Sequence, residues 1–400
     1  MLSLPPLALY VHLPWCVRKC PYCDFNSYQQ RGALPFDAYV DALLADLDQD
    51  LPLVWGRTIT SVFFGGGTPS LFPPAAIDRF LQQASARLRF APALEITLET
   101  NPGTAEHGRF EHYRAAGVNR LSFGVQSFDD ECLRKLGRIH DSAQAEAAIR
   151  LARDAGYDNF NIDLMYALPG QTLAMALHDL ERALALRPTH LSHYQLTLEP
   201  NTAFAARPPA GIPDEDGAWD IQEHCQRLIA EAGFDHYEVS AYARPGQQCA
   251  HNRNYWLFGD YLGIGAGAHG KITLPAFAPP GDADDDGAPR HPGGGILRRS
   301  KRRHPTAYMA AAASEQRIDT EEWIDASRRP FDFVLNALRL PEGFDLGLFE
   351  ARTGLPRTAI AAELQAARDR GWLAFDGERV YPTDLGQRFT NDVIGLFLTD

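Results

Sequence analysis

The stretch Cys16-Val17-Arg18-Lys19-Cys20-Pro21-Tyr22-Cys23 places three thiols at C-x3-C-x2-C spacing, directly after the apolar run Leu7–Leu13. Three thiolates this close in sequence can hold three irons of a cubane iron–sulfur cluster, whose usual complement is four cysteines. The fourth iron then lacks a protein ligand and is open to chemistry. The alternatives are a zinc site, which usually needs a fourth Cys or His at recognisable spacing, or three unrelated buried thiols.

The composition limits what the chain can do. Lys and Arg number 38 against 51 Asp and Glu, a net charge of −13, which argues against binding to nucleic acid or to an anionic membrane. Six cysteines in 400 residues, three of them in one loop, do not make a disulfide framework. There is no signal-peptide pattern and no apolar run of 18 residues or more. We therefore expect a cytoplasmic protein with reduced thiols.

The first half of the chain alternates between apolar runs and amphipathic stretches. Apolar runs bounded by turn residues predict strands at 7–13, 59–64, 94–100, 120–125, 160–165 and 191–198. Apolar residues at helical spacing predict a helix at Phe36, Tyr39, Val40, Leu43, Leu44 and Leu47, and further helices fit at 75–88, 106–116, 142–155 and 173–186. Apolar strands separated by helices indicate a parallel sheet covered by those helices. Six such units predict an α/β fold, a partial (β/α)6 TIM-like barrel within residues 1–240.

Residues able to bind ligands stand near the ends of these strands. The carboxyl ends of parallel strands share one rim of a barrel, where barrel enzymes carry their chemistry. The glycine-rich turn 65–67 and Thr68 follow the second strand, and Glu99, Gln126 and Asp163 stand near the ends of the next three. Each is weak evidence alone. Glycine-rich turns also occur for conformational reasons, and polar side chains also form hydrogen bonds with backbone groups at the ends of strands. Their common position on one rim is the stronger indication of a site.

The middle of the chain is less regular. A helix at 212–232 and a strand at 237–242 still fit. Residues 276–295 are rich in Pro, Gly and Asp and are expected to be a flexible surface insertion within a connecting region, 241–325. The basic stretch 298–304 that follows is interpreted as a solvated turn, with a contact for substrate carboxylates as the alternative.

Residues 326–400 are predicted to form a C-terminal α+β domain of the winged-helix type. Helices fit at 331–340, 346–353 and 359–370, an Asp-Gly turn joins two short strands within 372–381, and a final helix is expected at 384–398. Winged helices often bind DNA, but residues 331–400 carry 7 Arg against 11 Asp and Glu. A role as a structural lid or in substrate binding is therefore favoured over nucleic-acid binding.

The cysteine spacing after a first strand resembles that of the radical S-adenosylmethionine (SAM) superfamily. In that superfamily the amino and carboxylate groups of SAM chelate the open iron. The flanking sequences Tyr10-Val11-His12-Leu13-Pro14-Trp15-Cys16 and Cys20-Pro21-Tyr22-Cys23-Asp24-Phe25 are similar to the oxygen-independent coproporphyrinogen III oxidase group, and within it to the HemW-type haem chaperones. The resemblance covers nearly the whole chain, and it implies a [4Fe-4S] cluster held by Cys16, Cys20 and Cys23.

The resemblance also implies residues that bind SAM. Positions matching this chain in the oxidase family bind two SAM molecules. The first is contacted at Tyr10, Gly66 and Glu99, and the second at Tyr22, Gly67, Thr68, Gln126, Arg138 and Asp163. Arg pairs with carboxylates and Asp with ammonium groups, so this set suits a zwitterionic ligand. Whether one or two SAM molecules bind is left open.

Two features separate this chain from the oxidase. The oxidase pattern continues with a fourth cysteine two residues after Cys23, where this chain has Phe25. This chain also carries the His-Asn-x-x-Tyr-Trp motif of the HemW group, as His251-Asn252-Arg253-Asn254-Tyr255-Trp256. Neutral imidazole is a common axial haem ligand, and aromatic rings can pack on a porphyrin. His251 is therefore the expected haem ligand, with Cys249 and His269 as the next candidates.

Three functions follow from the resemblance. The first is a haem chaperone that binds haem or a related porphyrin and passes haem to an acceptor, such as a membrane respiratory protein. The second is an oxygen-independent coproporphyrinogen III oxidase, against which Phe25 argues. The third is a radical SAM methyltransferase. The resemblance implies a cytoplasmic protein that meets the membrane through its partners, and it leaves homodimer formation open.

Overall fold

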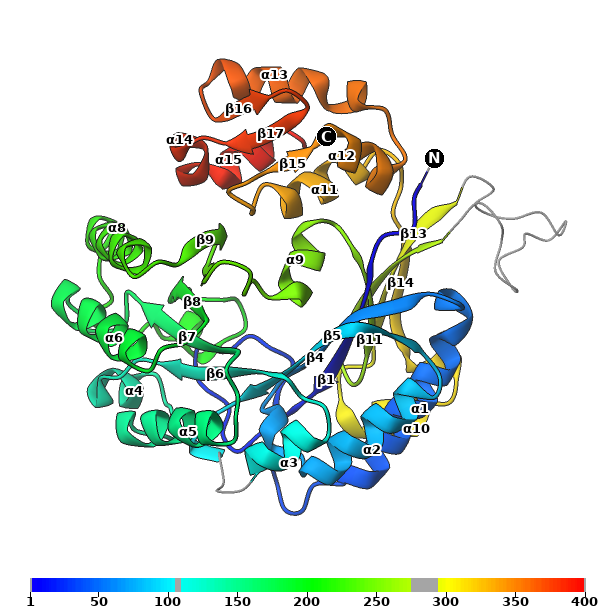
Figure 1. Cartoon of the computed structure of the whole chain (residues 1–400), viewed down its shortest axis with the longest axis vertical. Coiled ribbons are helices and arrows are strands. Elements are labelled where there is room, and N and C mark those ends of the chain that lie inside the picture. Colours follow the sequence, from blue (N-terminus) through cyan, green and yellow to red (C-terminus); the bar gives the residue numbers. More distant parts are fainter. Residues whose placement is uncertain (1, 105–108, 275–293, 399–400) are drawn as a thin grey trace, which may run out of the picture.

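A single twelve-stranded sheet dominates the computed structural model, which describes residues 2–104, 109–274 and 294–398. The strand order is β14-β13-β12-β11-β1-β4-β5-β6-β7-β8-β10-β9. The sheet curls into an incomplete barrel, with a layer of helices on its outer face (Figure 1). Within the described ranges the two edge strands, β14 and β9, do not pair with each other, so the barrel stays open.

Six parallel strands form the partial (β/α)6 barrel that the sequence predicts. In chain order they are β1 (Leu7–Leu13), β4 (Thr58–Gly66), β5 (Arg89–Thr100), β6 (Arg120–Gln126), β7 (Phe160–Tyr166) and β8 (His190–Gln195). Each strand pairs in parallel with the next, because the intervening helices return the chain to the same end of the sheet. The predicted fold class is confirmed, and the carboxyl ends of the strands share one rim.

Seven helices of the first 240 residues pack against this sheet from outside. They are α1 (Phe36–Asp50), α2 (Pro74–Ser85), α3 (Arg109–Ala115), α4 (Asp130–Lys135), α5 (Ser142–Asp154), α6 (Leu173–Ala185) and α8 (Glu215–Glu231). Leu43 and Leu47 of α1 belong to the same buried apolar cluster as Leu9 and Val11 of β1. Burial of such side chains holds the strands in place. The predicted start of the third helix, at 106, lies outside the described residues.

Residues 241–325, expected as a connecting region, add four strands to the β1 side of the sheet. These are β11 (Asp260–Ile264), β12 (His269–Leu274), β13 (Gly295–Lys301) and β14 (Ile318–Trp323). Strand β11 pairs in parallel with β1, and the other three continue the sheet in antiparallel fashion. Helices α9 (Ala250–Trp256) and α10 (Pro305–Ala311) lie in the same region. The predicted insertion 276–295 falls almost entirely outside the described residues.

The basic stretch 298–304 is not the solvated turn that was expected, because most of it lies in β13. Lys301 Nζ lies 2.6 Å from Asp50 and also pairs with Asp46. Arg317 contacts the same two carboxylates, at 2.9 Å from Asp46 and 2.6 Å from Asp50. These four side chains are buried, and buried charges persist only when they are paired. The pairs join α1 to β13, so the basic stretch is largely structural.

The C-terminal residues form a smaller unit with an apolar core of its own. Its helices are α11 (Arg329–Ala337), α12 (Leu346–Thr353), α13 (Ala361–Asp369), α14 (Asp384–Arg388) and α15 (Thr390–Gly395). They pack on a three-stranded sheet in the order β15-β17-β16, formed by β15 (Phe344–Asp345), β16 (Leu373–Asp376) and β17 (Arg379–Pro382). The predicted Asp-Gly turn joins β16 to β17, with Gly377 at a φ of 60°.

Two predicted elements are wrong in detail. The final helix is interrupted at Phe389, whose φ of −109° and ψ of 32° are not helical. The strand expected at 237–242 is two antiparallel strands, β9 (Asp235–Glu238) and β10 (Ala241–Ala243), because a tight turn between them leaves the apolar pattern unbroken. No helix in the described part of the chain is both long and apolar enough to span a bilayer.

Candidate cofactor site

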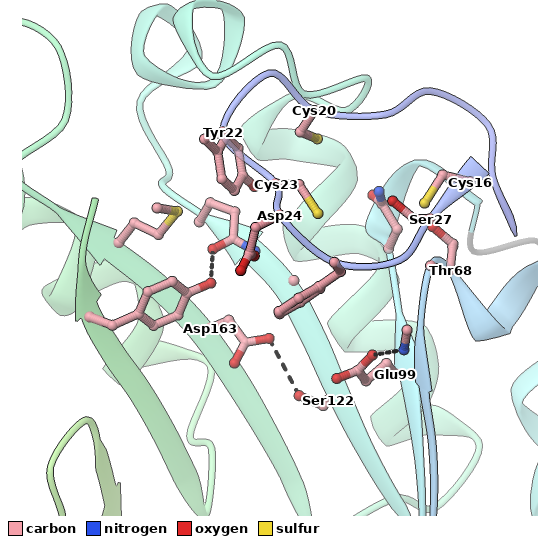
Figure 2. Close-up of a pocket in the computed structure, with 18 of the residues that line it drawn as sticks. Cys16, Cys20, Tyr22, Cys23, Asp24, Ser27, Thr68, Glu99, Ser122 and Asp163 are labelled. Atoms are coloured by element: carbon pink, nitrogen blue, oxygen red, sulfur yellow. Dashed lines mark hydrogen bonds between the residues drawn. The ribbon is translucent and has the colours of Figure 1, made fainter. Parts of the chain in front are cut away.

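The loop between β1 and α1 presents the three thiols at the carboxyl end of β1. Two short strands within it, β2 (Trp15–Cys16) and β3 (Tyr28–Gln29), pair in parallel. The Pro21 carbonyl accepts a hydrogen bond from Phe204 N at 3.0 Å, and Lys19 Nζ donates to the Phe25 carbonyl at 3.0 Å. These contacts hold the loop over a cavity of about 640 Å³ that all three cysteines line (Figure 2).

The three thiols are partly exposed, and none forms a disulfide. Burial raises the pKa of Cys16 and of Cys23, so both stay protonated at neutral pH until a metal displaces the proton. No three His, Cys, Asp or Glu side chains in the described ranges gather closely enough to hold one metal ion. An iron–sulfur cluster needs no such convergence, because its cysteines bind different irons. The spacing therefore fits a cluster better than a single zinc ion.

Several buried polar atoms on the cavity wall lack a hydrogen-bond partner within the described chain. They are Ser27 Oγ, Thr100 Oγ1 and Arg138 Nε. Figure 2 shows Ser27 beside Cys16, in the same loop. An unsatisfied buried polar group costs about 1–3 kcal/mol. A wall with several such groups fits a polar ligand that satisfies them, as a cluster with SAM would.

Most of the predicted site residues line this one cavity. They are Cys16, Cys20, Tyr22, Cys23, Gly66, Gly67, Thr68, Glu99, Gln126, Arg138 and Asp163. Apart from those of the cysteine loop, they come from strands β4 to β7 and the residue pair that follows β4, with Arg138 from the segment between α4 and α5. This agrees with a site on the barrel rim. Tyr10 lies outside this cavity and lines a neighbouring one together with Gly66 and Glu99. The role of each residue in binding SAM stays a prediction.

Two glycines at the end of β4 allow close approach of β1 and of the segment that leads into the cysteine loop. Gly66 has a φ of 113°, and a Cβ atom on it would lie 2.5 Å from His12 Cε1. A Cβ atom on Gly67 would lie 2.5 Å from the carbonyl oxygen of Trp15. Gly67 N donates to the Leu13 carbonyl at 2.8 Å. Gly67 thus lets the segment that carries the thiols pack against the end of β4, which is a conformational reason for glycine at this position.

Glu99, at the end of β5, has a strongly perturbed carboxyl group. Burial, and next to it the charge of Asp163, raise the pKa of Glu99 to about 8, although Gly66 N donates to its Oε2 at 3.2 Å. Burial also raises the pKa of Asp163, which accepts hydrogen bonds from Asn161 at 2.7 Å and Ser122 at 3.4 Å (Figure 2). Two neighbouring carboxyls with raised pKa values favour a cationic ligand group, which lets them ionise.

Gln126 is held in an unusual backbone conformation at the end of β6. Its φ is 76°, and the pairing of β6 with β7 shifts register between Gly124 and Gln126. A positive φ costs a non-glycine residue about 1–3 kcal/mol, and such strain often serves to aim a side chain. Gln126 Oε1 accepts a hydrogen bond from Tyr194 at 2.8 Å. Tyr194, which the sequence analysis missed, also lines the cavity, and as an aromatic residue inside an apolar run it carried no distinguishing signal.

His251 does not line any of the cavities around the thiols. Its side chain is 2% exposed, Nδ1 lies 3.1 Å from Ser61 Oγ, and the ring stacks on Phe63 with centroids 4.9 Å apart. Cys249 is fully buried as well. Its Nε2 has no hydrogen-bond partner within the described chain, and the ring faces none of these cavities as it stands, so the axial-ligand role stays a prediction that this buried position does not favour. The later motif residues line a cavity of about 330 Å³ instead: Asn252, Tyr255 and Trp256.

Comparison with known proteins agrees with this geometry. The model of the radical SAM superfamily matches residues 10–183, and that of the HemN C-terminal domain matches residues 324–389. Heme chaperone HemW of Escherichia coli (strain K12) is 48% identical to this chain, with 100% of both chains covered. The chain belongs to the HemW family. The HemW protein of Haemophilus influenzae is 45% identical, again over 100% of both chains.

The HemW family shares its architecture with a solved radical SAM enzyme. Coproporphyrinogen III oxidase (HemN) from Escherichia coli superposes with a TM-score of 0.80 at 25% identity, over 98% of this chain and 90% of that chain. Membership of the radical SAM superfamily implies a [4Fe-4S] cluster and SAM as cofactors. In this HemW family member the three thiols and the unsatisfied polar groups of the cavity wall fit that cofactor pair.

Proposed function

We propose that this HemW family member is a haem chaperone. It binds haem, holds a [4Fe-4S] cluster with SAM, and passes haem to an acceptor such as a membrane respiratory protein. The main support for this proposal is the 48% identity, over the entire chain, to a protein named heme chaperone HemW. Because the three thiols of the loop carry no disulfide, and reduced thiols are typical of the cytosol, we place the protein in the cytoplasm, where its acceptor brings it to the membrane.

The cavities support a ligand larger than the cluster alone. Cavities of about 640, 570 and 330 Å³ share Phe25 and Glu99 in their walls. A single binding site for a small molecule typically measures about 300–1,000 Å³. The first cavity adjoins the thiols and suits SAM. The other two contain Tyr255 and further aromatic side chains, which suit a flat, largely apolar ligand.

The residues of the first cavity have separate roles in this proposal. When bound, the cluster and SAM supply the electron-transfer chemistry. Cys16, Cys20 and Cys23 hold the cluster, and the guanidinium of Arg138 lies beside the sulfur of Cys20. Glu99 and Gly66, with Tyr10 from the neighbouring cavity, contact one SAM molecule. A second SAM molecule is assigned to the remaining predicted residues: Tyr22, Gly67, Thr68, Gln126, Arg138 and Asp163.

The oxidase is the second candidate, because the superposition with HemN extends over nearly the whole chain. One experiment separates the two functions. Anaerobically reconstituted protein is titrated with haemin, and in parallel it is incubated with coproporphyrinogen III, SAM and a reductant. The chaperone proposal expects saturable haem binding, transfer of haem to a haem-free respiratory protein in membranes, and no protoporphyrinogen. Formation of protoporphyrinogen would establish the oxidase, and a methylated product would establish a methyltransferase.

A further inference from the structure

A row of polar side chains leads from the cofactor site into the interior of the barrel. We call the cavity that the three cysteines line the thiol cavity, and Asp163 lies in its wall (Figure 2). Behind Asp163 follow Asn161 of β7, His190 of β8 and Tyr237 of β9, and all three are buried. Barrel interiors are usually filled by branched apolar side chains. A buried polar row in this place therefore has a purpose other than packing.

Short hydrogen bonds join the members of this row. Asn161 Nδ2 donates to Asp163 Oδ1 at 2.7 Å. Asn161 Oδ1 lies 2.7 Å from His190 Nδ1, and His190 Nε2 lies 2.7 Å from the Tyr237 hydroxyl. Both ring nitrogens of His190 are thus engaged by neighbours that are themselves buried. The four side chains form one continuous chain of hydrogen bonds from the barrel interior to the thiol cavity.

The orientation of the Asn161 amide follows from its partners. Its Nδ2 also donates to Ser122 Oγ at 2.8 Å, and its Oδ1 accepts from Ser192 Oγ at 3.1 Å. With the amide turned round, its oxygen would face a carboxylate oxygen of Asp163, and two acceptors repel each other. Burial raises the pKa of Asp163, and the hydrogen bond from Asn161 is the largest of the contacts that act against this rise. The amide therefore helps to keep Asp163 ionised.

The same contacts select one tautomer of His190. Its Nδ1 carries the proton, because this atom faces the amide oxygen of Asn161. Burial, and next to it the charge of Arg120, lower the pKa of His190 well below its usual value, so the ring is neutral and Nε2 is an acceptor. Burial raises the pKa of Tyr237, so its hydroxyl stays protonated and donates to Nε2. All hydrogen bonds of the chain therefore point from Tyr237 toward Asp163.

The start of helix α9 holds the far end of the chain. The Tyr237 hydroxyl accepts a hydrogen bond from Cys249 N at 3.4 Å, and Cys249 is the N-cap residue of α9. Glu95 Oε1 accepts from the next backbone amide, Ala250 N, at 3.0 Å. This helix carries the His-Asn-x-x-Tyr-Trp motif. Its position thus helps to set the position of Tyr237, and through the chain that of Asp163.

We propose that His190 is a positioning residue for Asp163. Held by Tyr237 as the tautomer protonated at Nδ1, it fixes the Asn161 amide, and this amide keeps Asp163 as a carboxylate that receives a cationic group of SAM. The inference rests on the proposed function, which assigns Asp163 to a SAM molecule. Neither His190 nor Tyr237 lines the thiol cavity or the two cavities beside it, so both act on the ligand through Asn161 and Asp163.

The test uses the full-length protein with its cluster reconstituted, titrated with SAM by calorimetry. Tyr237→Phe removes the donor that selects the tautomer, so the Asn161 amide can turn its oxygen toward Asp163. SAM affinity should fall about tenfold, as for the loss of one hydrogen bond to a charged group, with iron and sulfide content unchanged. The matched control is Tyr157→Phe, because Tyr157 is also buried and its hydroxyl has no partner within the described ranges. This control should keep the wild-type affinity.

Two comparisons separate positioning from a general effect on the fold. His190→Asn can offer an amide N–H in place of Nδ1–H, and it should keep more of the SAM affinity than His190→Leu, which has no donor. In a double-mutant cycle, Asp163→Asn should itself weaken SAM binding, and adding Tyr237→Phe should weaken it no further, because the chain then no longer ends on a carboxylate. Additive losses would show that Tyr237 only supports the fold, and they would overturn the proposal.

The tautomer of His190 is measured directly, by NMR of its ring nitrogens in the cluster-free protein. The wild type should carry the proton on Nδ1, and Tyr237→Phe should change this. A wild-type ring protonated on Nε2 would overturn the proposal, and so would unchanged SAM affinity in Tyr237→Phe. In both cases the proposed function stands, because the wild type still binds SAM. If the wild type binds no SAM, the SAM assignment within the proposed function falls, and this proposal falls with it.

Discussion

The guanidinium of Arg138 lies 3.6 Å from the sulfur of Cys20, although the two residues are 118 positions apart in the sequence. The same guanidinium lies 3.5 Å from the Tyr22 hydroxyl and donates to the Gly124 carbonyl. The fold therefore places a permanent positive charge beside one of the three cluster thiols. Such a charge favours a cluster that has gained an electron, because it attracts the added negative charge.

Arg138→Gln should lower the reduction potential of the reconstituted cluster, by roughly tens of millivolts, because the added electron loses a nearby positive charge. Redox titration followed by electron paramagnetic resonance measures this shift. Arg134→Gln is the control, since Arg134 belongs to α4 but is exposed and does not line the cavity. Equal potentials in the two variants would show that Arg138 acts only on the fold of the loop.

Replacing Cys16, Cys20 or Cys23 singly with Ala should abolish the broad visible absorption of the reconstituted cluster. A site with three thiolates has no spare ligand, whereas the fold has little dependence on these partly exposed side chains. The control is Cys225→Ala, which removes a buried thiol in the core and should leave the cluster intact. A full complement of iron and sulfide in any of the three loop variants would contradict the assignment.

Gly67→Ala should displace the cysteine loop. The added Cβ would lie 2.5 Å from a backbone oxygen, that of Trp15, and the chain cannot move away without losing the hydrogen bonds that hold the loop. We expect a lower melting temperature and a lower cluster content. Gly347→Ala in α12 is the matched control, because nothing lies within 4 Å of its added Cβ. In a helix this change should raise stability by about 0.5–1 kcal/mol.

Glu99 should make stability depend on pH. Its pKa is raised by burial to about 8 in the folded protein, against about 4.3 in an unfolded chain. The folded state therefore binds a proton that the unfolded state has lost, and this contribution to stability disappears as the pH rises from about 5 to 8. Glu99→Gln should remove that part of the dependence and be more stable than wild type at pH 8. Melting temperatures of the cluster-free proteins at pH 5 to 8 measure this pH dependence. If the melting temperatures of wild type and variant fall in parallel as the pH rises, the prediction is wrong.

The same variant should bind SAM more weakly. A cationic group of SAM favours the ionised carboxylate, so binding to the wild type at pH 7 should release a proton from Glu99. Calorimetry in two buffers of different ionisation enthalpy detects this release, and Glu99→Gln should lack it. Unchanged affinity for SAM and unchanged proton release would show that Glu99 does not contact SAM and only forms hydrogen bonds with backbone groups at the ends of the strands.

His251→Ala should reduce the free energy of unfolding by about 2–4 kcal/mol, because it empties a buried, well-packed position. The haem spectrum of the protein that remains folded should not change, since His251 lines none of the cavities. Chemical denaturation and a haemin titration at low temperature measure the two effects. A normal unfolding curve together with a lost Soret band would restore His251 as the haem ligand.

Local spacing alone was enough to predict the cysteine site. Cys16, Cys20 and Cys23 lie within eight residues, so no long-range contact is needed to bring them together. The rim residues Glu99, Gln126 and Asp163 were predicted next, because alternating apolar strands and amphipathic helices require a parallel sheet whose carboxyl ends meet. For these residues, the order of strands and helices in the sequence was enough to predict that they lie near one another.

Tertiary structure alone decided the rest of the site. The Arg138–Cys20 contact and the pairing of Lys301 with Asp46 and Asp50 join segments that no local pattern relates. The role of His251 depended on which face of the short helix α9 turns into the core, and a seven-residue helix has too few turns to reveal this in its sequence. Periodicity and spacing determine which residues are buried and which are neighbours along the chain. Which distant side chains meet is determined only when the sheet and its helices have assembled, because burial and charge pairing depend on the whole fold.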